Sequence, residues 1–284
     1  MSTTKTSRTT AAALAGTTGQ NDPDELLELF DARGNPTGVA LSRATVHVRG
    51  AWHQAFHCWI VRPGDRGVEV VLQRRARHKD TFPGCWDAAA AGHWRFGESP
   101  EEAAREIGEE LGLAVPFAQL TWLGRERSTR SHPNGLVDRE HHQVYLLRWD
   151  EPLASYRPDP AEVAALAAVG AADLLAMAAG RLQQALPTEA ASVGRDGSVM
   201  PATDTVVRRP ELVPYSVARL RRLLAGERRL RHRGPSEPSE ALVNWGAGPG
   251  TSRVHDREIG GISRISGISV PDGDVQLSKE SDNG

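Results

Sequence analysis

The 284-residue sequence contains only two cysteines, few aromatic residues and almost no net charge. Cys58 and Cys85 cannot form a disulfide framework, and this scarcity of cysteine suits the reducing cytoplasm. The formal charge is −2, so no overall field attracts nucleic acids or acidic membranes. No run of about 18 apolar residues occurs, so we expect no transmembrane helix. These absences predict a cytoplasmic protein whose partners are neither nucleic acids nor membranes.

Composition divides the chain into four parts. Residues 1–22 are rich in Thr, Ala and Gly and have few large apolar side chains, so we expect a disordered arm. One domain is expected over residues 23–185, where apolar runs alternate with turn signals. A loop and a basic helical extension follow over residues 186–233. Residues 234–284 are rich in Gly, Ser and Pro and are expected to form a disordered tail.

Apolar runs rich in β-branched and aromatic residues, separated by turns with Gly and Pro, predict a series of strands. We expect strands over residues 26–30, 39–48, 52–62, 68–74, 120–127, 142–149 and 162–169, and helices over residues 171–179 and 217–224. The segments 128–139 and 187–213 are expected to be loops.

The stretch Gly92–Leu113 has the signals of a loop followed by a short acidic helix. Ser99 is a favourable N-cap, and Pro100 suits the first helical position. Glu102 lies three residues after the cap, which is the spacing of a capping box. Gly112 is a natural helix end. The sequence therefore predicts one helix between Ser99 and Gly112.

Acidic side chains dominate one side of this expected helix. Four glutamates fall on neighbouring parts of one face: Glu102, Glu106, Glu109 and Glu110. A solvated acidic face is the simplest interpretation, and Arg105 is the local basic residue. Because Glu109 and Glu110 lie at the helix C-terminus, where the dipole is already negative, their placement favours a bound cation. Converging carboxylates suit a hard ion such as Mg²⁺ or Mn²⁺.

The same stretch resembles the Nudix box, G-x5-E-x7-R-E-U-x-E-E-x-G-U with U apolar, which marks the Nudix hydrolases. The segment from Arg105 to Leu113, REIGEELGL, matches the second half of this pattern completely. The first half departs in one respect, because six residues rather than seven separate Glu98 from Arg105. The resemblance implies a Nudix α/β/α sandwich with a mixed sheet.

The resemblance also implies roles for individual residues. Four glutamates would bind Mg²⁺, with Mn²⁺ as the alternative ion: Glu98, Glu106, Glu109 and Glu110. Arg105 would orient these carboxylates. Glu140 would add a catalytic carboxylate from across the cleft, unless it lies in a surface turn around Asn134-Gly135. The implied reaction is metal-dependent attack of water at phosphorus, which cleaves the pyrophosphate of a nucleoside diphosphate linked to another moiety.

A basic loop, Arg74–Lys79, precedes the box. One interpretation is a solvated loop. The other is an electrostatic clamp for a polyphosphate, in which Arg74, Arg75 and Lys79 bind the substrate. Its position before the Pro83-Gly84 turn and the box makes the two interpretations equally strong.

The order of these motifs resembles the branch of the superfamily that includes isopentenyl-diphosphate isomerase. Five residues fall where the metal ligands of that isomerase would lie: His47, His53, His93, Asp138 and Glu140. However, Ala91 stands where the isomerase needs a cysteine, and Ser128 matches its active-site tyrosine. Allylic proton transfer needs a proton donor on one face of the substrate and an acceptor on the other. Alanine and serine do not supply that pair, and the three histidines are also open to a purely structural interpretation.

The sequence therefore predicts a Nudix-type diphosphohydrolase whose substrate is a small nucleoside diphosphate derivative. Two alternatives remain. One is an isopentenyl-diphosphate isomerase, and the other is a non-catalytic nucleotide-binding sensor, since the box is one residue short. The sequence leaves a homodimer open.

Overall fold

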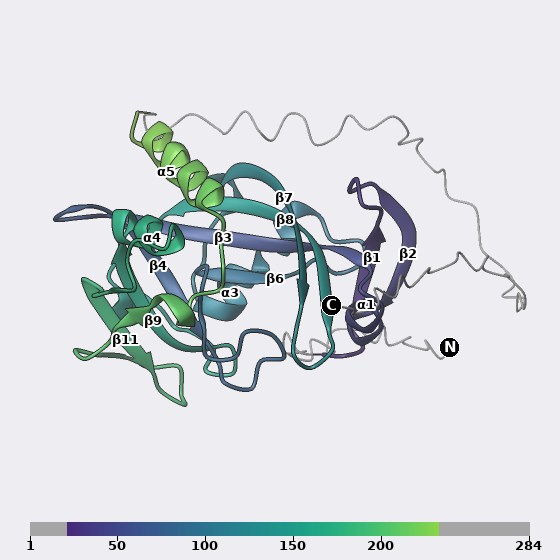
Figure 1. The fold of residues 1–284 in the computed structure, drawn as a ribbon, viewed down its shortest axis with the longest axis horizontal. Helices are drawn as coiled ribbons and strands as arrows, with labels where there is room; N and C mark the ends of the chain where they lie inside the picture. Colours follow the sequence, from purple (N-terminus) through teal and green to yellow (C-terminus); the bar gives the residue numbers. More distant parts are fainter. Residues whose placement is uncertain (1–21, 233–284) are drawn as a thin grey trace, which may run out of the picture. The chain divides into compact units, whose positions relative to one another are not determined.

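The computed structural model describes residues 22–232 (Figure 1). The helices are α1 (Arg43–Arg49), α2 (Pro100–Ala103), α3 (Arg105–Leu111), α4 (Ala171–Ala178) and α5 (Val217–His232). The strands are β1 (Leu26–Phe30), β2 (Pro36–Ser42), β3 (Trp52–Gly64), β4 (Gly67–Arg75), β5 (Trp86–Asp87), β6 (Ala90–His93), β7 (Thr121–Ser131), β8 (Val137–Arg148), β9 (Val163–Gly170), β10 (Gln184–Ala185), β11 (Glu189–Val193), β12 (Val199–Pro201) and β13 (Val207–Arg208). Short 3-10 turns lie at Phe117–Gln119, Leu153–Ser155 and Arg209–Glu211.

A nine-stranded mixed sheet forms the centre of the domain. Its main path has the strand order β12-β11-β9-β4-β3-β8-β7, while β5 pairs with β4 and β6 pairs with β3. Strand β3 runs parallel to β8 and antiparallel to β4 and β6. Its run from His53 to Val61 is buried throughout, as expected for a central strand covered on both faces.

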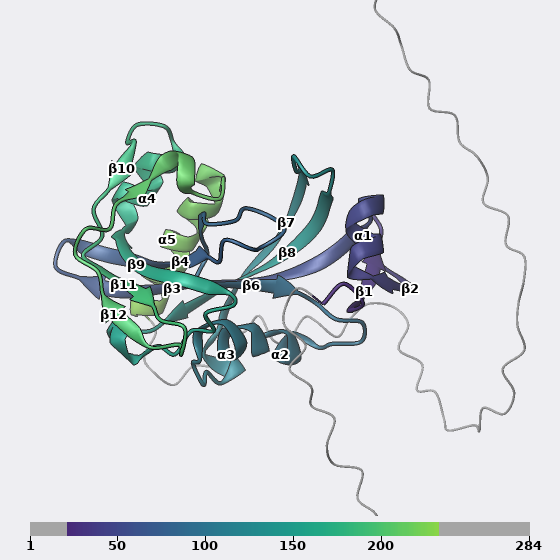
Figure 2. The ribbon, with the colours of Figure 1, turned by 90° about the horizontal axis from the view of Figure 1, so that it is seen from below.

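Helices cover both faces of the sheet. Figure 2 shows α2 and α3 on one face and α4 and α5 on the other. Alternation along β3 divides the core in the same way. Phe56, Cys58 and Ile60 join the apolar cluster that includes α3, whereas Trp59 and Val61 join the cluster that includes α4 and α5. The α/β/α sandwich with a mixed sheet is therefore confirmed.

The expected capping box is also formed. Ser99 Oγ accepts a hydrogen bond from the Glu102 backbone N–H at 3.2 Å, and Glu102 Oε2 accepts one from the Ser99 N–H at 2.7 Å. Gly112 ends α3 with a φ of 65°. Strands β1, β4 and β9 and helix α4 lie within a residue of their expected bounds.

The helix of the box is broken, which corrects the expectation of one continuous helix. Ala104 separates α2 from α3 with φ −68° and ψ −7°. The Ile107 N–H donates to Ala104 O at 3.2 Å, so the first turn of α3 is tight. This break compensates for the missing residue of the box. Arg105 Nε still donates to Glu98 Oε1 at 2.7 Å despite the shorter spacing.

The strand expected over residues 39–48 is wrong in its second half. Strand β2 ends at Ser42, whose hydroxyl accepts a hydrogen bond from the Thr45 N–H at 3.4 Å. Helix α1 begins there and ends at Gly50, where φ is 57°. Three β-branched residues in this segment imitate a strand, but the two caps favour a helix. His47 therefore comes from a helix.

The two expected loops are also corrected. Strand β7 continues to Ser131 and β8 begins at Val137, so a hairpin turn at residues 132–136 replaces the loop over 128–139. Strands β11 and β12 lie within the expected loop 187–213, where β11 pairs with β9 and extends the sheet. Both errors arise because these segments lack the apolar alternation that marks a strand in the sequence, and their pairing in the sheet makes them strands.

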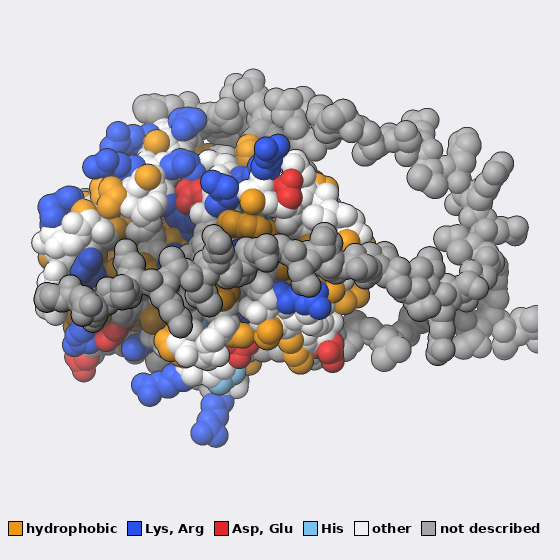
Figure 3. All heavy atoms as spheres, turned by 45° about the vertical axis from the view of Figure 1, so that its right-hand side comes forward, with side chains coloured by type: hydrophobic (Ala, Val, Ile, Leu, Met, Phe, Trp, Pro, Cys, Tyr) orange, Lys and Arg blue, Asp and Glu red, His pale blue; other side chains and the backbone are white. Residues whose placement is uncertain are grey.

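Helix α5 is twice the expected length and carries many arginines. Leu220 and Leu223 are buried in the core, whereas Arg221, Arg228 and Arg229 are exposed. Figure 3 shows basic side chains gathered at the upper left, at the height where Figure 1 places α5. The helix is thus amphipathic and packs by its leucine face.

The expected tail (234–284) lies outside the described residues, as does the expected arm (1–22) apart from Asp22. Within residues 22–232, none of the helices has the length and apolar character needed to cross a membrane.

Gly112→Ala should destabilise the domain more than Gly135→Ala. Both glycines have positive φ, 65° and 85°, so each substitution costs about 1–2 kcal/mol in left-handed strain. The added Cβ would lie 2.3 Å from Arg157 O at position 112, whereas nothing lies within 4 Å of it at position 135. We expect Gly112→Ala to lower the free energy of unfolding by about 1–3 kcal/mol more, measured by urea denaturation. Equal losses would contradict the close approach of α3 to the Arg157 backbone.

Candidate functional site

Four cationic side chains line a small cavity of about 80 Å³, which we call the polar cavity. They are Arg43 from α1, Arg75 from β4, Lys79 from the following loop and Arg130 from β7. Arg43 Nη1 lies 3.0 Å from Asp80 Oδ2, and Arg75 Nη1 lies 3.1 Å from Asp87 Oδ2. Lys79 Nζ is paired with Glu162. These pairs hold the cationic groups in fixed positions around the cavity.

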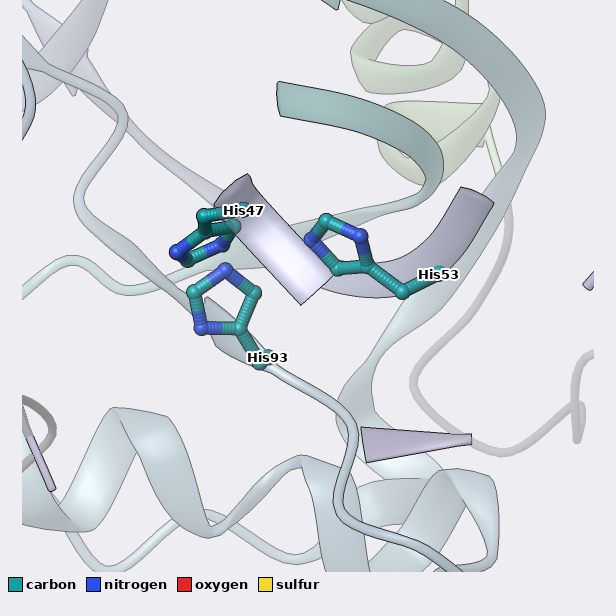
Figure 4. Close-up of side chains that lie close together, drawn as sticks. All are labelled: His47, His53 and His93. Carbon is teal, nitrogen blue, oxygen red and sulfur yellow. The ribbon is translucent and has the colours of Figure 1, made fainter. Parts of the chain in front are cut away.

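Three histidines from three different elements meet beside the polar cavity. Figure 4 shows the rings of His47 from α1, His53 from β3 and His93 from β6 gathered together. Their ring centroids are 5.0 to 5.3 Å apart. One nitrogen from each ring lies within 4.8 Å of the other two. We call this group the histidine cluster.

Two carboxylates from β8 border the histidine cluster. Glu140 Oε1 lies 3.7 Å from His53 Nε2 and 3.6 Å from His93 Nε2. Asp138 Oδ1 lies 3.6 Å from His47 Nε2. The structure therefore brings together all five residues that the isomerase resemblance placed at a metal site.

The histidine cluster fits a divalent transition metal. Among the described residues, the buried Nε2 atoms of His47 and His53 have no hydrogen-bond partner. His53 Nδ1 lies 3.0 Å from Ala51 O, which can only accept, so its lone pair is on Nε2 and faces the cluster. Burial lowers the pKa of His47 to about 2 and that of His93 to about 4, so both rings are neutral and able to bind metal at pH 7. Imidazoles suit Zn²⁺ or Fe²⁺ better than Mg²⁺, and the carboxylates of Asp138 and Glu140 beside them also suit Mn²⁺.

A chain of hydrogen bonds fixes Glu140 from the other side. Arg219 Nη2 lies 2.6 Å from His142 Nδ1, and His142 Nε2 lies 2.7 Å from Glu140 Oε2. A guanidinium can only donate, so His142 Nδ1 accepts and its Nε2–H donates to Glu140. Burial alone would raise the pKa of Glu140, but the His142 ring that donates to it holds the pKa well below its ordinary value. His57, His142 and Glu140 also lie close enough to hold a metal ion, but both ring nitrogens of His142 are already engaged by Arg219 and Glu140.

The box glutamates do not share one face. Glu106 and Glu110 are buried under β6, whereas Glu109 is 43% exposed. A Cβ at Gly92 would lie 2.2 Å from the Glu106 carboxyl carbon, so any larger residue there would displace the Glu106 carboxylate. Glu110 Oε2 accepts from the Ala91 N–H at 2.9 Å, on the floor of the polar cavity. Burial raises the pKa of Glu110 to about 7 and that of Glu106 well above its ordinary value.

One guanidinium organises the rest of the box. Arg105 Nη1 lies 2.5 Å from Glu106 Oε1 and 2.8 Å from Glu109 Oε2. Its Nε donates to Glu98 Oε1, and Glu98 Oε2 also accepts from the Arg95 backbone N–H at 2.8 Å. Arg105 thus holds three of the four expected metal-binding glutamates, while Glu110 points away from it toward Ala91.

The basic loop divides between two places. Arg75 and Lys79 line the polar cavity, as the clamp interpretation requires. Arg74 follows the other face of β4, because successive side chains of a strand alternate. It lies over the Trp86 ring at 5.6 Å and donates to Gly84 O at 2.9 Å. The structure therefore separates Arg74 from the other two predicted substrate-binding residues.

Sequence reasoning missed several residues of this site: Arg43, His57, Asp87, Arg130, His142 and Tyr215. Arg43 lies four residues before His47, so a correctly assigned α1 would have placed both on one helix face. Tyr215 comes from the segment before α5, far from the box in sequence, and its hydroxyl donates to Asp87. No local signal in the sequence marks that contact.

Comparison with known proteins agrees with this architecture. A sequence model of the NUDIX domain matches residues 51–188. The chain is 34% identical over 143 residues to an uncharacterized Nudix hydrolase of Clostridium acetobutylicum, over 50% of this chain and 68% of that protein. It is 35% identical over 168 residues to an isopentenyl-diphosphate Delta-isomerase of Cutibacterium acnes, over 57% of this chain and 82% of that protein. The chain therefore belongs to the Nudix family.

Its relatives are divided between hydrolases and isomerases, so family membership leaves the reaction open between the two. Among solved structures, DR0079 from Deinococcus radiodurans is 24% identical, covering 55% of this chain and 90% of that one with a TM-score of 0.40. A divalent metal ion is typical of the family, and the histidine cluster is a candidate site for one.

The histidine cluster should make the domain sensitive to mild acid. The unfolded chain protonates histidine near pH 6.5, whereas folded His93 and His47 have pKa values of about 4 and about 2. The contribution of these two rings to the free energy of unfolding is therefore complete above pH 6.5. It falls as pH decreases toward 4, by up to about 1.4 kcal/mol per pH unit for each ring. His47→Gln should reduce this slope in urea titrations with EDTA present. The exposed His78→Gln should not, and equal slopes for wild type and His47→Gln would refute the account.

Metal binding should depend on the histidine cluster in particular. His53→Gln removes one buried nitrogen of the cluster, so the affinity of the metal-free protein for Zn²⁺ or Mn²⁺ should fall at least about tenfold. Calorimetry measures this directly, with His78→Gln as the matched control on an exposed histidine. Unchanged affinity in His53→Gln would place the metal elsewhere, at the box glutamates.

Proposed function

We propose that the protein is a metal-dependent hydrolase that cleaves the phosphoanhydride bond of a small diphosphate compound. The observation that carries this proposal is the joining of four cations, the histidine cluster and ionised Glu140 around one polar cavity. A diphosphate needs several cations to offset its charge. The cavity supplies four, and carboxylates already position three of them, Arg43, Arg75 and Lys79.

The cations act by holding the diphosphate in one orientation. Arg75 is fixed by Asp87, and Arg43 by Asp80, so little side-chain freedom is lost when phosphate oxygens bind. Lys79 and Arg130 add charge from the loop and from β7. Positioning of this kind accounts for much of the catalysis of phosphoryl transfer.

The proposed step is attack of water at phosphorus. The water oxygen forms a bond to phosphorus, the bridging P–O bond breaks, and two monophosphate products leave. Glu140, whose carboxylate borders the histidine cluster, accepts the proton of the water. A divalent ion held by His47, His53 and His93 would neutralise phosphate charge and lower the pKa of a bound water.

The box residues position the backbone at the floor of the polar cavity, around Ala91. Glu110 holds the Ala91 backbone, and Glu106 packs against Gly92, so α3 fixes the segment that carries His93. A second ion, Mg²⁺ or Mn²⁺, bound by Glu98, Glu106, Glu109 and Glu110 stays a prediction. A nucleoside diphosphate derivative as the substrate likewise stays a prediction.

Isomerisation of isopentenyl diphosphate is the second candidate, favoured by the arrangement of the histidine cluster with Asp138 and Glu140. Position 91 argues against it. Ala91 lies in the wall of the polar cavity with only a methyl group to offer. Ser128 pairs across the strands with Glu140 but is no tyrosine, so the usual second proton-transfer group is not at either matched position.

Hydrolysis should be lost when Glu140 loses its charge. We expect Glu140→Gln to lower kcat about 10²–10⁴-fold, because the amide cannot accept the proton. Arg75→Gln should raise KM about tenfold or more through loss of a charge-assisted hydrogen bond. Arg77→Gln, an exposed arginine of the same loop, is the control and should resemble wild type. Phosphate release from a panel of diphosphates with Mn²⁺ or Mg²⁺ provides the measurement.

Other outcomes identify the alternatives. Formation of dimethylallyl diphosphate without phosphate release would show an isomerase. Nucleotides that raise the melting temperature while no diphosphate in the panel is turned over would show a sensor. Equal effects of Arg75→Gln and Arg77→Gln would show that the polar cavity does not bind the diphosphate.

A further inference from the structure

A second and larger cavity adjoins the polar cavity. Its volume is about 430 Å³, and we call it the apolar cavity. Buried apolar side chains from the sheet, α4 and α5 form most of its wall, among them Trp59, Leu72, Trp86, Leu174, Met177 and Leu220. It lies on the face of the sheet that α4 and α5 cover.

The two cavities share part of their walls. Phe82, Asp87, Val213 and Tyr215 line both. Phe82 has a φ of 48°, which is strained for a bulky residue, and such strain is kept where structure around it serves a site. The Tyr215 ring stands edge-on to Trp59 at 4.8 Å, and its hydroxyl donates to Asp87. Phe82 and Tyr215 therefore stand where the polar cavity meets the apolar one.

The sizes of the cavities require a substrate to extend beyond the first. Sites for small molecules usually measure about 300–1,000 Å³. The polar cavity, at about 80 Å³, has room for a phosphate group but not for a whole organic substrate. The apolar cavity alone falls in the usual range. The organic group of a diphosphate bound to the cations would pass the shared residues and extend toward the apolar cavity.

The apolar cavity offers little to recognise a polar group such as a nucleobase. Asp87 already accepts from Arg75, Tyr215 and the Ala88 N–H. The indole nitrogens of Trp59 and Trp86 have no hydrogen-bond partner, but they lie beneath the accessible surface, out of reach of a ligand in the cavity. Arg209 is at the exposed rim and donates to Met177 O at 3.0 Å. Each nucleobase donor or acceptor buried here without a partner would cost about 1–3 kcal/mol.

The outer wall of the apolar cavity comes from residues that follow the matched family domain. The domain match ends at residue 188, while residues 209, 210, 212–215 and 220 line the apolar cavity. The Val213 N–H donates to Trp86 O at 2.8 Å and ties this wall to β5. The extension after the domain thus builds the cavity.

We propose that the apolar cavity binds the hydrocarbon chain of an alkyl diphosphate whose head group occupies the polar cavity. This inference rests on the proposed function for its chemistry, because it names the organic group of that substrate. Water would attack the terminal phosphorus, the bridging P–O bond would break, and inorganic phosphate and an alkyl monophosphate would leave while Glu140 takes the proton.

Chain length is the first test. The wild-type protein is titrated with ethyl, hexyl, decyl and dodecyl diphosphate, with EDTA present to suppress turnover, and binding is measured by calorimetry. Each methylene that enters the cavity should tighten binding about twofold to fourfold until the cavity is filled. Uridine and adenosine diphosphates should bind no better than ethyl diphosphate. Affinity independent of chain length, or tighter binding of the nucleotides than of decyl diphosphate, would overturn the inference.

A filling substitution is the second test. Ala178 on α4 lines the apolar cavity, whereas Ala172 on the same helix is exposed. Ala178→Phe should weaken binding of decyl diphosphate at least about tenfold and leave ethyl diphosphate unchanged. Ala172→Phe is the matched control and should change neither, and thermal melting checks that both variants fold. Equal behaviour of the two variants would show that the hydrocarbon chain does not bind in the apolar cavity.

The design separates the two proposals. Chain-length-dependent binding without phosphate release in the presence of Mn²⁺ or Mg²⁺ would mean that the proposed hydrolysis fails while the apolar cavity binds as inferred. Phosphate release from ethyl and decyl diphosphates at equal kcat/KM would mean that hydrolysis stands and the apolar cavity takes no part.

Discussion

The parallel pairing of β3 with β8 is the constraint on which the site depends. Its register places His53 opposite Glu140, although 86 residues separate them along the chain. Antiparallel pairing of β6 with β3 then sets His93 opposite Ala55, two residues from His53 and on the same face. A slip of one residue in either pairing would turn these side chains to the other face of the sheet. The sheet therefore serves as the frame for the candidate metal site.

Burying so many ionisable groups is costly unless each finds a partner, and here the partners come from distant elements. Arg219 from α5 donates to His142 on β8 and also pairs with Glu126 on β7 at 2.6 Å. Through His142 it fixes the charge on Glu140. A helix outside the matched family domain thus takes part in the electrostatics of the site, which couples the C-terminal extension to the chemistry at the sheet.

The difference between a hydrolase and an isomerase on this fold is confined to a few side chains. The histidine cluster and the cations suit either reaction, because both need a bound diphosphate. Ala91 and Ser128 lack the groups that proton transfer to carbon requires. Function in this family is therefore a property of the site and not of the fold. In the same way, the side chains of the apolar cavity, and not the fold, would select the organic group of the substrate.

From the sequence, cap signals determined the capped start and the Gly112 end of the box helix, while the resemblance to the Nudix family implied the mixed sandwich and pointed to the histidines and carboxylates. The sequence prediction misplaced His47 in a strand and took β7, β8 and β11 partly for loops, because these segments lack the apolar alternation that marks a strand in a short window. Only the tertiary structure decided which glutamates are buried, that Arg74 leaves the clamp, and that Tyr215 and Arg219 reach the site. These depend on contacts between segments far apart in sequence, where burial and hydrogen-bond geometry are set by the packing of the whole domain.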